Sequence, residues 1–201
     1  MQHRNRVRRI ALIGFAATTL GLSAIAGAQE VPVNQDLQRN VNQEQRIDNG
    51  MRDGQLTTRE ASQLEQGQAH VDRMEQRDLS RGPLTGQEQT QIQHAENVQS
   101  RDIYRDAHNS NEGNPNSASS RRMQADVQRD INQQRRIDNG VRKGSLNNAQ
   151  TARLEGREAR VDHMERRAGA NGYVNRNEQR HVQQAENRNS RAIHRNKWQG
   201  R

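Results

Sequence analysis

Oxygen-bearing side chains surround a glycine in the first half of the chain. Asn49, Asp53 and Glu60 flank Gly54 within a stretch of twelve residues. Amide and carboxylate oxygens are the ligands that calcium takes, and calcium needs about six or more of them. Met51 stands where this spacing needs another oxygen. We therefore expect no metal site, and Asn49, Asp53 and Glu60 are the candidate ligands if there is one.

Segment 49–60 resembles the second half of an EF-hand loop, which has glycine at its sixth position and an acid at its twelfth. The resemblance implies calcium binding. In the matching segment 139–150, Val141 and Lys143 hold ligand positions and no carboxylate is present. Calcium binding by relic EF-hand-like loops is therefore an alternative function and not the main one.

No arrangement of residues typical of catalysis is visible. Cysteine is absent, and no glycine-rich phosphate loop or G-x-S-x-G motif occurs. No two histidines have the H-x-x-x-H spacing of a zinc site. Acids are frequent, but a general acid needs a buried carboxyl with a shifted pKa, and the thin apolar stripes of this sequence predict little burial. We expect no enzyme and no cofactor.

The chain repeats itself after ninety residues. The segment RIDNG occurs at 46–50 and again at 136–140, and aligning 36–109 with 126–199 gives 32 identities in 74 positions. An internal duplication of this kind indicates a repeat protein. The expected organisation is a signal peptide at 1–28, a first helical repeat at 29–106, a flexible linker at 107–122 and a second repeat at 123–201.

Apolar residues in each copy recur at helical spacing. Leu37, Val41 and Ile47 show it in the first copy, and Val127 and Ile131 show it in the second. Each stripe has about one apolar residue per turn, so three helices must bury it against one another. The sequence predicts an all-α fold, a tandem duplication of a three-helix unit in which each copy forms its own small core.

Four turns share the form G-x-[LV]-[TN]-x-x-[EQ]. A glycine at the end of a helix takes the left-handed conformation. A Thr or Asn three residues later caps the next helix, and the following Glu or Gln closes a capping box. These residues are expected to be structural: Gly54, Thr57 and Glu60; Gly82, Thr85 and Glu88; Gly144, Asn147 and Gln150; Gly172, Asn175 and Glu178.

A polar motif, QxAENxxSRxIxR, also occurs in both copies, at 93–105 and 183–195. Its simplest interpretation is a solvated helix face with pairs at i,i+4 spacing. The alternative is an interaction face with a partner. Its residues would be Gln93, Glu96, Asn97 and Arg101, with Gln183, Glu186, Asn187 and Arg191.

The beginning of the chain indicates export. Arginines, an apolar run and the small residues Ala26-Gly27-Ala28 follow the layout of a signal peptide cut before Gln29, which predicts a periplasmic or secreted protein with no transmembrane segment after cleavage. The net charge of +8 falls to +4 without the four arginines of 1–28. The first copy is acidic and the second basic, so polyanion binding by the second copy is a further alternative, although the lack of an aromatic platform argues against nucleic acid.

Two families share short features with this chain. The turns LTTRE and LTGQE resemble the motif of the periplasmic LTxxQ stress proteins, and the whole chain resembles uncharacterised secreted helical repeat proteins of proteobacteria with SGQLT-type turns. The first resemblance implies a role in envelope stress. Our main prediction is a non-enzymatic protein that acts through protein–protein surfaces, with a protein partner or self-association. The sequence leaves a small-molecule ligand open.

Overall fold

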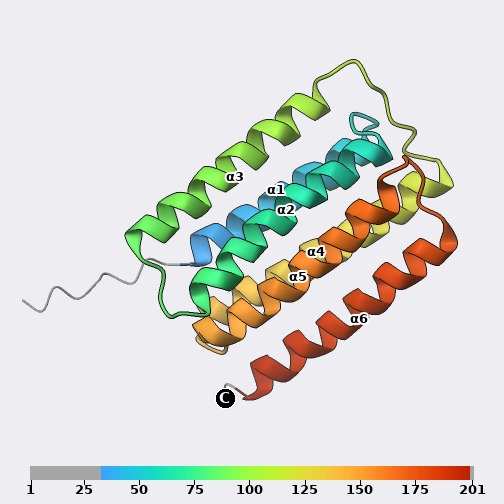
Figure 1. The fold of residues 1–201 in the computed structure, drawn as a ribbon. Helices are drawn as coiled ribbons and strands as arrows, with labels where there is room; N and C mark the ends of the chain where they lie inside the picture. The colour runs from blue at the N-terminus through green and yellow to red at the C-terminus, as the bar shows by residue number, and fades with distance from the viewer. Residues whose placement is uncertain (1–32, 200–201) are drawn as a thin grey trace, which may run out of the picture.

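The computed structural model describes residues 33–199, which form six helices and no strands (Figure 1). The helices are α1 Asn34–Arg52, α2 Thr58–Leu79, α3 Gly86–Ala107, α4 Ala118–Arg142, α5 Asn148–Gly169 and α6 Arg176–Gln199. This confirms the all-α prediction. Within the described range, no helix is both long and apolar enough to cross a membrane. The predicted signal peptide, 1–28, lies outside the described residues.

Each of the four repeated turns ends one helix and starts the next. At the first turn, Gly54 has a φ of 75°, which a side chain would strain. Thr57 then accepts a hydrogen bond from the Glu60 N–H, and the Glu60 carboxylate accepts one from the Thr57 N–H at 2.9 Å. The same reciprocal pairs form between Thr85 and Glu88, Asn147 and Gln150, and Asn175 and Glu178. Local chemistry alone therefore sets the helix boundaries.

Helices from the two copies pack on each other at the centre of the molecule. α2 packs most extensively on α5, and α1 packs on α4. α3 covers α1 and α2 on one side, while α6 covers α4 and α5 on the opposite side (Figure 1). α2 and α5 are antiparallel, since Ser62 near the start of α2 contacts Gly169 at the end of α5. Four central helices thus form a bundle with one helix on each flank.

Both apolar clusters contain residues of both copies, in place of the separate core that we expected for each copy. In the first, Ile47, Leu64 and Ile103 pack with Met123 and Ile131. The second has the same mixture: Leu37, Val71, Leu79 and Ile92 with Ile137, Leu154 and Ile193. A stripe of one apolar residue per turn can be buried here because a helix of the other copy covers it.

The connection between the copies is shorter than the predicted linker 107–122. α3 ends at Ala107 and α4 already begins at Ala118. The Gly113 N–H donates to the Gly54 carbonyl at 2.8 Å. A Cβ at Gly113 would lie 2.2 Å from the Leu56 carbonyl oxygen. The connection therefore packs directly on the turn between α1 and α2.

Replacing Gly169 by alanine is expected to lower the free energy of unfolding by about 1–3 kcal/mol, the usual cost of overpacking. A Cβ there would lie 2.5 Å from the Ser62 Cβ and 3.1 Å from the Thr58 carbonyl oxygen, so α2 and α5 must separate. Gly86→Ala is the control, because its Cβ would meet no atom within 4 Å. Equal denaturation midpoints for the two variants would contradict the close α2–α5 contact.

Candidate metal centre

The EF-hand-like residues do not form a calcium loop. Asn49 lies inside α1 and is exposed, and Asp53 is the residue that ends this helix. The Glu60 carboxylate accepts hydrogen bonds from Thr57 and from the side-chain amides of Asn109, at 2.8 Å, and Asn111, at 2.6 Å. Burial raises the pKa of Glu60, but these hydrogen bonds outweigh it and hold the pKa below its ordinary value. The Glu60 carboxylate therefore links the turn between α1 and α2 to the segment that connects the two copies.

The repeated polar motif faces inward in part. Glu96 and Glu186 are buried, which contradicts a wholly solvated or partner-facing surface at these two positions. Gln93 and Gln183 are half-buried. Asn97, Arg101, Asn187 and Arg191 are exposed.

In each copy, the arginine of RIDNG bonds to the serine of the repeated polar motif. Arg46 donates to the Ser100 hydroxyl at 2.7 Å and to its carbonyl at 3.1 Å. Arg136 makes the same two bonds with Ser190 in the second copy. In both copies, these bonds therefore hold the third helix against the first.

The interior of the bundle is rich in carboxyl groups, which our sequence analysis expected at the surface. Burial raises the pKa of thirteen acids: Asp36, Glu44, Glu65, Asp72, Glu75, Glu96, Asp126, Asp130, Glu155, Glu158, Asp162, Glu165 and Glu186. Within 33–199, no Lys or Arg is buried. The expectation that these helices offer no buried carboxyl was wrong.

Helix periodicity places the central acids on one face. Glu65, Asp72 and Glu75 are separated by seven and three residues, which puts them on the same side of α2. Each directly follows an apolar residue of the buried stripe, namely Leu64, Val71 and Met74. α5 repeats the arrangement with Glu155, Asp162 and Glu165 after Leu154, Val161 and Met164. This duplicated spacing is the sequence signal that we missed.

Because α2 and α5 are antiparallel, the two sets of acids meet across the helix interface. Asp72 and Glu75 of α2 lie with Glu155 of α5, and each of the three offers an oxygen within 4.8 Å of the others. Asp162 and Glu165 of α5 form the matching group with Glu65 of α2. We call these the first and the second triad. The ninety-residue repeat relates them, so each triad takes residues from both copies.

Several of these carboxyl groups have no hydrogen-bond donor. Neither oxygen of Glu65 or of Glu165 accepts a hydrogen bond from an amide, a hydroxyl or a basic group, although both side chains are fully buried; their hydrogen-bonding neighbours are the carboxyl groups of Glu44 and Asp130. The polar neighbours are other acids, such as Glu44 beside Glu65. An isolated buried carboxylate costs several kcal/mol. Each such group must therefore hold a proton or be neutralised by a cation that enters the bundle.

The pKa values show how strongly ionisation is opposed. Burial raises the pKa of Glu44 and of Glu155 to about 8. The pKa of Asp162 lies well above its ordinary value because of burial first, and then because of the charges of Glu44 and Glu155. At neutral pH a bound cation would replace these protons.

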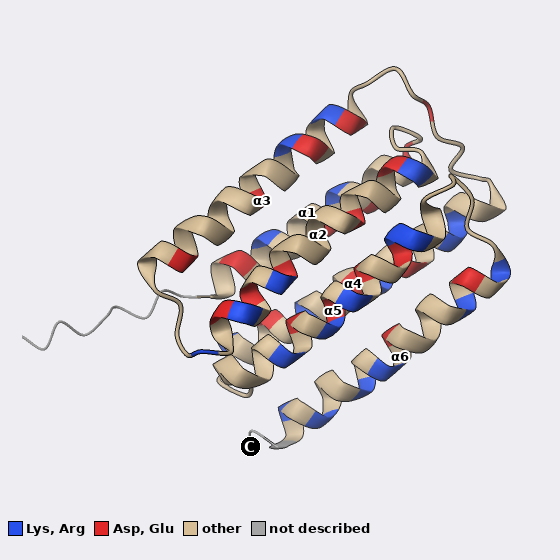
Figure 2. Cartoon of the chain, viewed as in Figure 1, with Lys and Arg blue, Asp and Glu red and all other residues tan. Residues whose placement is uncertain are grey.

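Positive charge reaches the interior acids from the outer side of the bundle. Arg39 pairs with Glu96 at 3.0 Å, and Arg129 pairs with Glu186 at the same distance. Both arginine side chains are partly exposed. Figure 2 shows further Lys and Arg positions along the helices, most clearly on α6. The triads themselves contain no arginine or lysine.

The donor set of the triads suits a hard cation. Carboxylate and amide oxygens are the ligands of calcium, manganese and magnesium, whereas zinc and copper prefer nitrogen and sulfur. Neither triad includes a histidine. The Gln134 amide lies close by, donating to Glu155 at 3.1 Å, and its own oxygen is buried without a partner. Because the N–H groups of Gln134 face Glu155 and Asp72, the amide would have to turn over for its oxygen to bind a cation.

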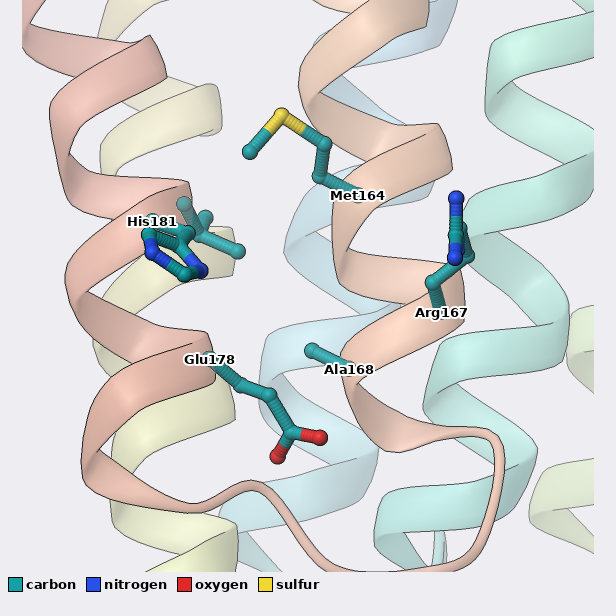
Figure 3. Close-up of a pocket in the computed structure, with 6 residues that line it drawn as sticks. Met164, Arg167, Ala168, Glu178 and His181 are labelled. Atoms are coloured by element: carbon teal, nitrogen blue, oxygen red, sulfur yellow. The ribbon is translucent and has the colours of Figure 1, made fainter.

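Two surface pockets lie away from the triads. The pocket between α5 and α6 has a volume of about 370 Å³, and Met164 and His181 extend toward each other across it while Arg167 points away (Figure 3). Its acid, Glu178, is engaged by the Asn175 N–H at 2.8 Å. The pocket between α2 and α3 measures about 630 Å³. Neither is lined by a triad carboxylate.

No family model matches this chain, and no curated protein or solved structure matches it either.

Proposed function

We propose that this protein binds divalent cations through oxygen ligands inside its helical bundle, at the first and second triads. The observation that carries the proposal lies in the second triad, where Glu65 and Glu165 are fully buried and have only other carboxyl groups as hydrogen-bond partners. In the first triad, one oxygen of Glu155 lacks a donor. A cation between three carboxylates supplies the missing partner and neutralises charges that burial otherwise opposes. The ion class is that of the EF-hand alternative, but the ligands are different residues.

Calcium and manganese fit the triads better than magnesium does. The triads are fully enclosed, so an entering ion must give up most of its water. Magnesium dehydrates reluctantly and usually keeps several water ligands. Calcium also tolerates irregular geometry and carboxylates that bind through one or two oxygens. We therefore propose a cation-binding protein of the periplasm or the extracellular space, without catalytic activity.

A protein partner remains a second proposal, and an exposed patch on α3 supports it. Val98 and Tyr104 are 38% and 61% exposed. They share the helix with Asn97 and Arg101, the exposed residues of the repeated motif. The patch is small, and the buried triads support cation binding more strongly. We further infer that the fold arose by duplication of a three-helix unit, since α1, α2 and α3 correspond to α4, α5 and α6 after a shift of ninety residues.

Equilibrium dialysis against Mn²⁺ or Ca²⁺, with metal analysis of the protein, tests the proposed function. We expect at least two ions per chain at neutral pH, one in each triad. The double variant Glu65→Gln with Glu155→Gln removes one carboxylate from each triad and should lower the affinity at least tenfold. Asp53→Asn is the control because it removes the EF-hand-like candidate. Loss of binding in Asp53→Asn alone would place the ion in the loop instead.

A further inference from the structure

The two copies differ at several positions beside the triads, and one of these differences replaces a hydrogen-bond donor by an acid. Asp130 on α4 corresponds to Asn40 on α1 after the ninety-residue shift. The Asn40 amide donates to both oxygens of Glu75, at 3.2 and 3.0 Å, and lies 3.5 Å from an Asp72 oxygen. An N–H donor stands here where an acid stands in the other copy. The first triad is therefore already partly satisfied by the protein.

Asp130 instead completes another group of acids. Asp130, Glu165 and Glu186 each offer an oxygen within 4.8 Å of the other two. Both oxygens of Asp130 are buried without a donor, as are both oxygens of Glu165. Glu165 belongs to this group and to the second triad. A carboxylate has two oxygens, so one group can bridge two ions.

We propose that the second copy holds a pair of divalent cations bridged by Glu165, whereas the first copy holds a single ion. This inference rests on the proposed function and adds the number of ions and their arrangement. The paired site is formed by Glu65, Asp162, Glu165, Asp130 and Glu186.

Charge balance supports a pair at this site. Its five carboxylates carry five negative charges when ionised. Two divalent cations supply four positive charges, and Arg129, 3.0 Å from Glu186, supplies the fifth. The neighbouring acids Glu44, Glu158 and Asp126 must keep their protons for this balance to hold. A single divalent ion would leave two carboxylates buried without compensation, which is costly in a medium of low polarity.

The matching place in the first copy disfavours a second ion. The equivalents of Asp130, Glu165 and Glu186 are Asn40, Glu75 and Glu96. The hydrogens of the Asn40 amide point at the Glu75 carboxylate. They compensate part of its charge and disfavour a second ion between Asn40, Glu75 and Glu96, so the single ion of the first triad would bind through Asp72, Glu155 and the remaining lone pairs of Glu75.

Native mass spectrometry and electron paramagnetic resonance of the full chain loaded with Mn²⁺ test the inference. We expect three Mn²⁺ per chain, two of them giving the exchange-coupled spectrum of a bridged pair. Asp130→Asn, which copies the first half of the chain, should bind two ions and lose the coupled signal. Asn40→Asp, the reverse exchange, should bind four ions and show a second coupled pair.

The outcomes separate this inference from the proposed function. Absence of any bound Mn²⁺ in the folded wild-type chain overturns both. If the wild type and Asp130→Asn both bind two ions with uncoupled spectra, the bridged pair is refuted. One ion in each triad is then still supported. Circular dichroism of the variants checks that the helical content is unchanged, since Asp and Asn have the same shape.

Discussion

The metal-free protein is expected to lose stability steeply as the pH rises from about 5 to about 8.5. Burial raises the pKa of Glu44, Glu155 and Glu186 to about 8, and that of Asp126 to about 7. A raised pKa in the folded state stabilises the fold below the ordinary pKa, and this contribution disappears as the pH passes the raised value.

The expected loss of stability is large compared with the free energy of unfolding of a whole domain. One pKa unit corresponds to about 1.36 kcal/mol, so a carboxyl whose pKa moves from 4.5 to about 8 contributes on the order of 5 kcal/mol. An ordinary domain unfolds at a cost of about 5–15 kcal/mol. Ionisation of these groups therefore opposes folding by an amount comparable to the stability of a whole domain.

Addition of Mn²⁺ or Ca²⁺ should reverse the trend. The ion competes with the protons, so it binds more tightly as the pH rises. Thermal unfolding followed by circular dichroism at pH 5, 7 and 8.5, with chelator or with millimolar metal, checks this. We expect the metal to raise the melting temperature by more than about 10 °C at pH 8.5 and by little at pH 5. A metal-free melting temperature that climbs with pH would contradict the arrangement of the interior acids.

Neutralising the acids of the second triad should stabilise the metal-free protein. In Glu65→Gln with Glu165→Gln, the shape is kept while two groups that resist ionisation are removed. We expect the free energy of unfolding at pH 8.5 to rise, because burial raises the pKa of both groups and opposes their ionisation. The stabilisation by Mn²⁺ should fall sharply in the same variant.

A variant that is more stable without metal but is stabilised less by Mn²⁺ identifies the replaced carboxyl groups as metal ligands. A carboxyl kept for packing or hydrogen bonding would destabilise the protein when replaced, whereas a ligand that the metal-free fold barely accommodates does the reverse. Glu112→Gln, at an exposed position of the connection, is the control and should change neither quantity. A double variant less stable than the wild type in the presence of chelator would count against the proposal.

Helix limits could be predicted from the sequence because they depend on neighbouring residues. Gly54 and the pair of Thr57 and Glu60 act within one turn of chain. The same is true of Asn147 and Gln150, which close the box with an amide in place of a carboxylate. No distant contact is needed to form these caps, so their pattern is readable directly.

The shared core could not be predicted in this way. Leu64 and Ile131 pack in one cluster although sixty-six residues separate them in the chain. Which helix covers an apolar stripe depends on packing between copies, and the periodicity of one helix does not specify it. We therefore assigned each copy its own core, and the structure joins them.

The candidate site was missed because acids were assumed to face water. Glu65 and Glu155 each follow a leucine of the buried stripe, and their positions repeat in both copies. The repetition of these acids beside apolar residues could have been recognised from the sequence alone. The meeting of Glu65 with Asp162 across two helices was not readable, because it depends on the antiparallel contact of α2 and α5.

The charge difference between the copies does not produce ion pairs between them in residues 33–199. We found an acidic first copy and a basic second copy in the sequence. In the described part of the chain, every ion pair that we find lies within one copy. Contacts between copies include hydrogen bonds to uncharged acceptors, such as that from the Arg142 guanidinium to the Gln38 amide oxygen at 3.0 Å. In residues 118–198 no Lys or Arg is buried.

The location of bound metal in a crystal tests the central claim most directly. Crystals grown with Mn²⁺ at pH 7.5 would be measured above and below the manganese absorption edge. Our account predicts anomalous peaks between Asp72, Glu75 and Glu155, and between Glu65, Asp162 and Glu165. Peaks confined to surface carboxylates, with the two triads free of anomalous signal, would contradict it.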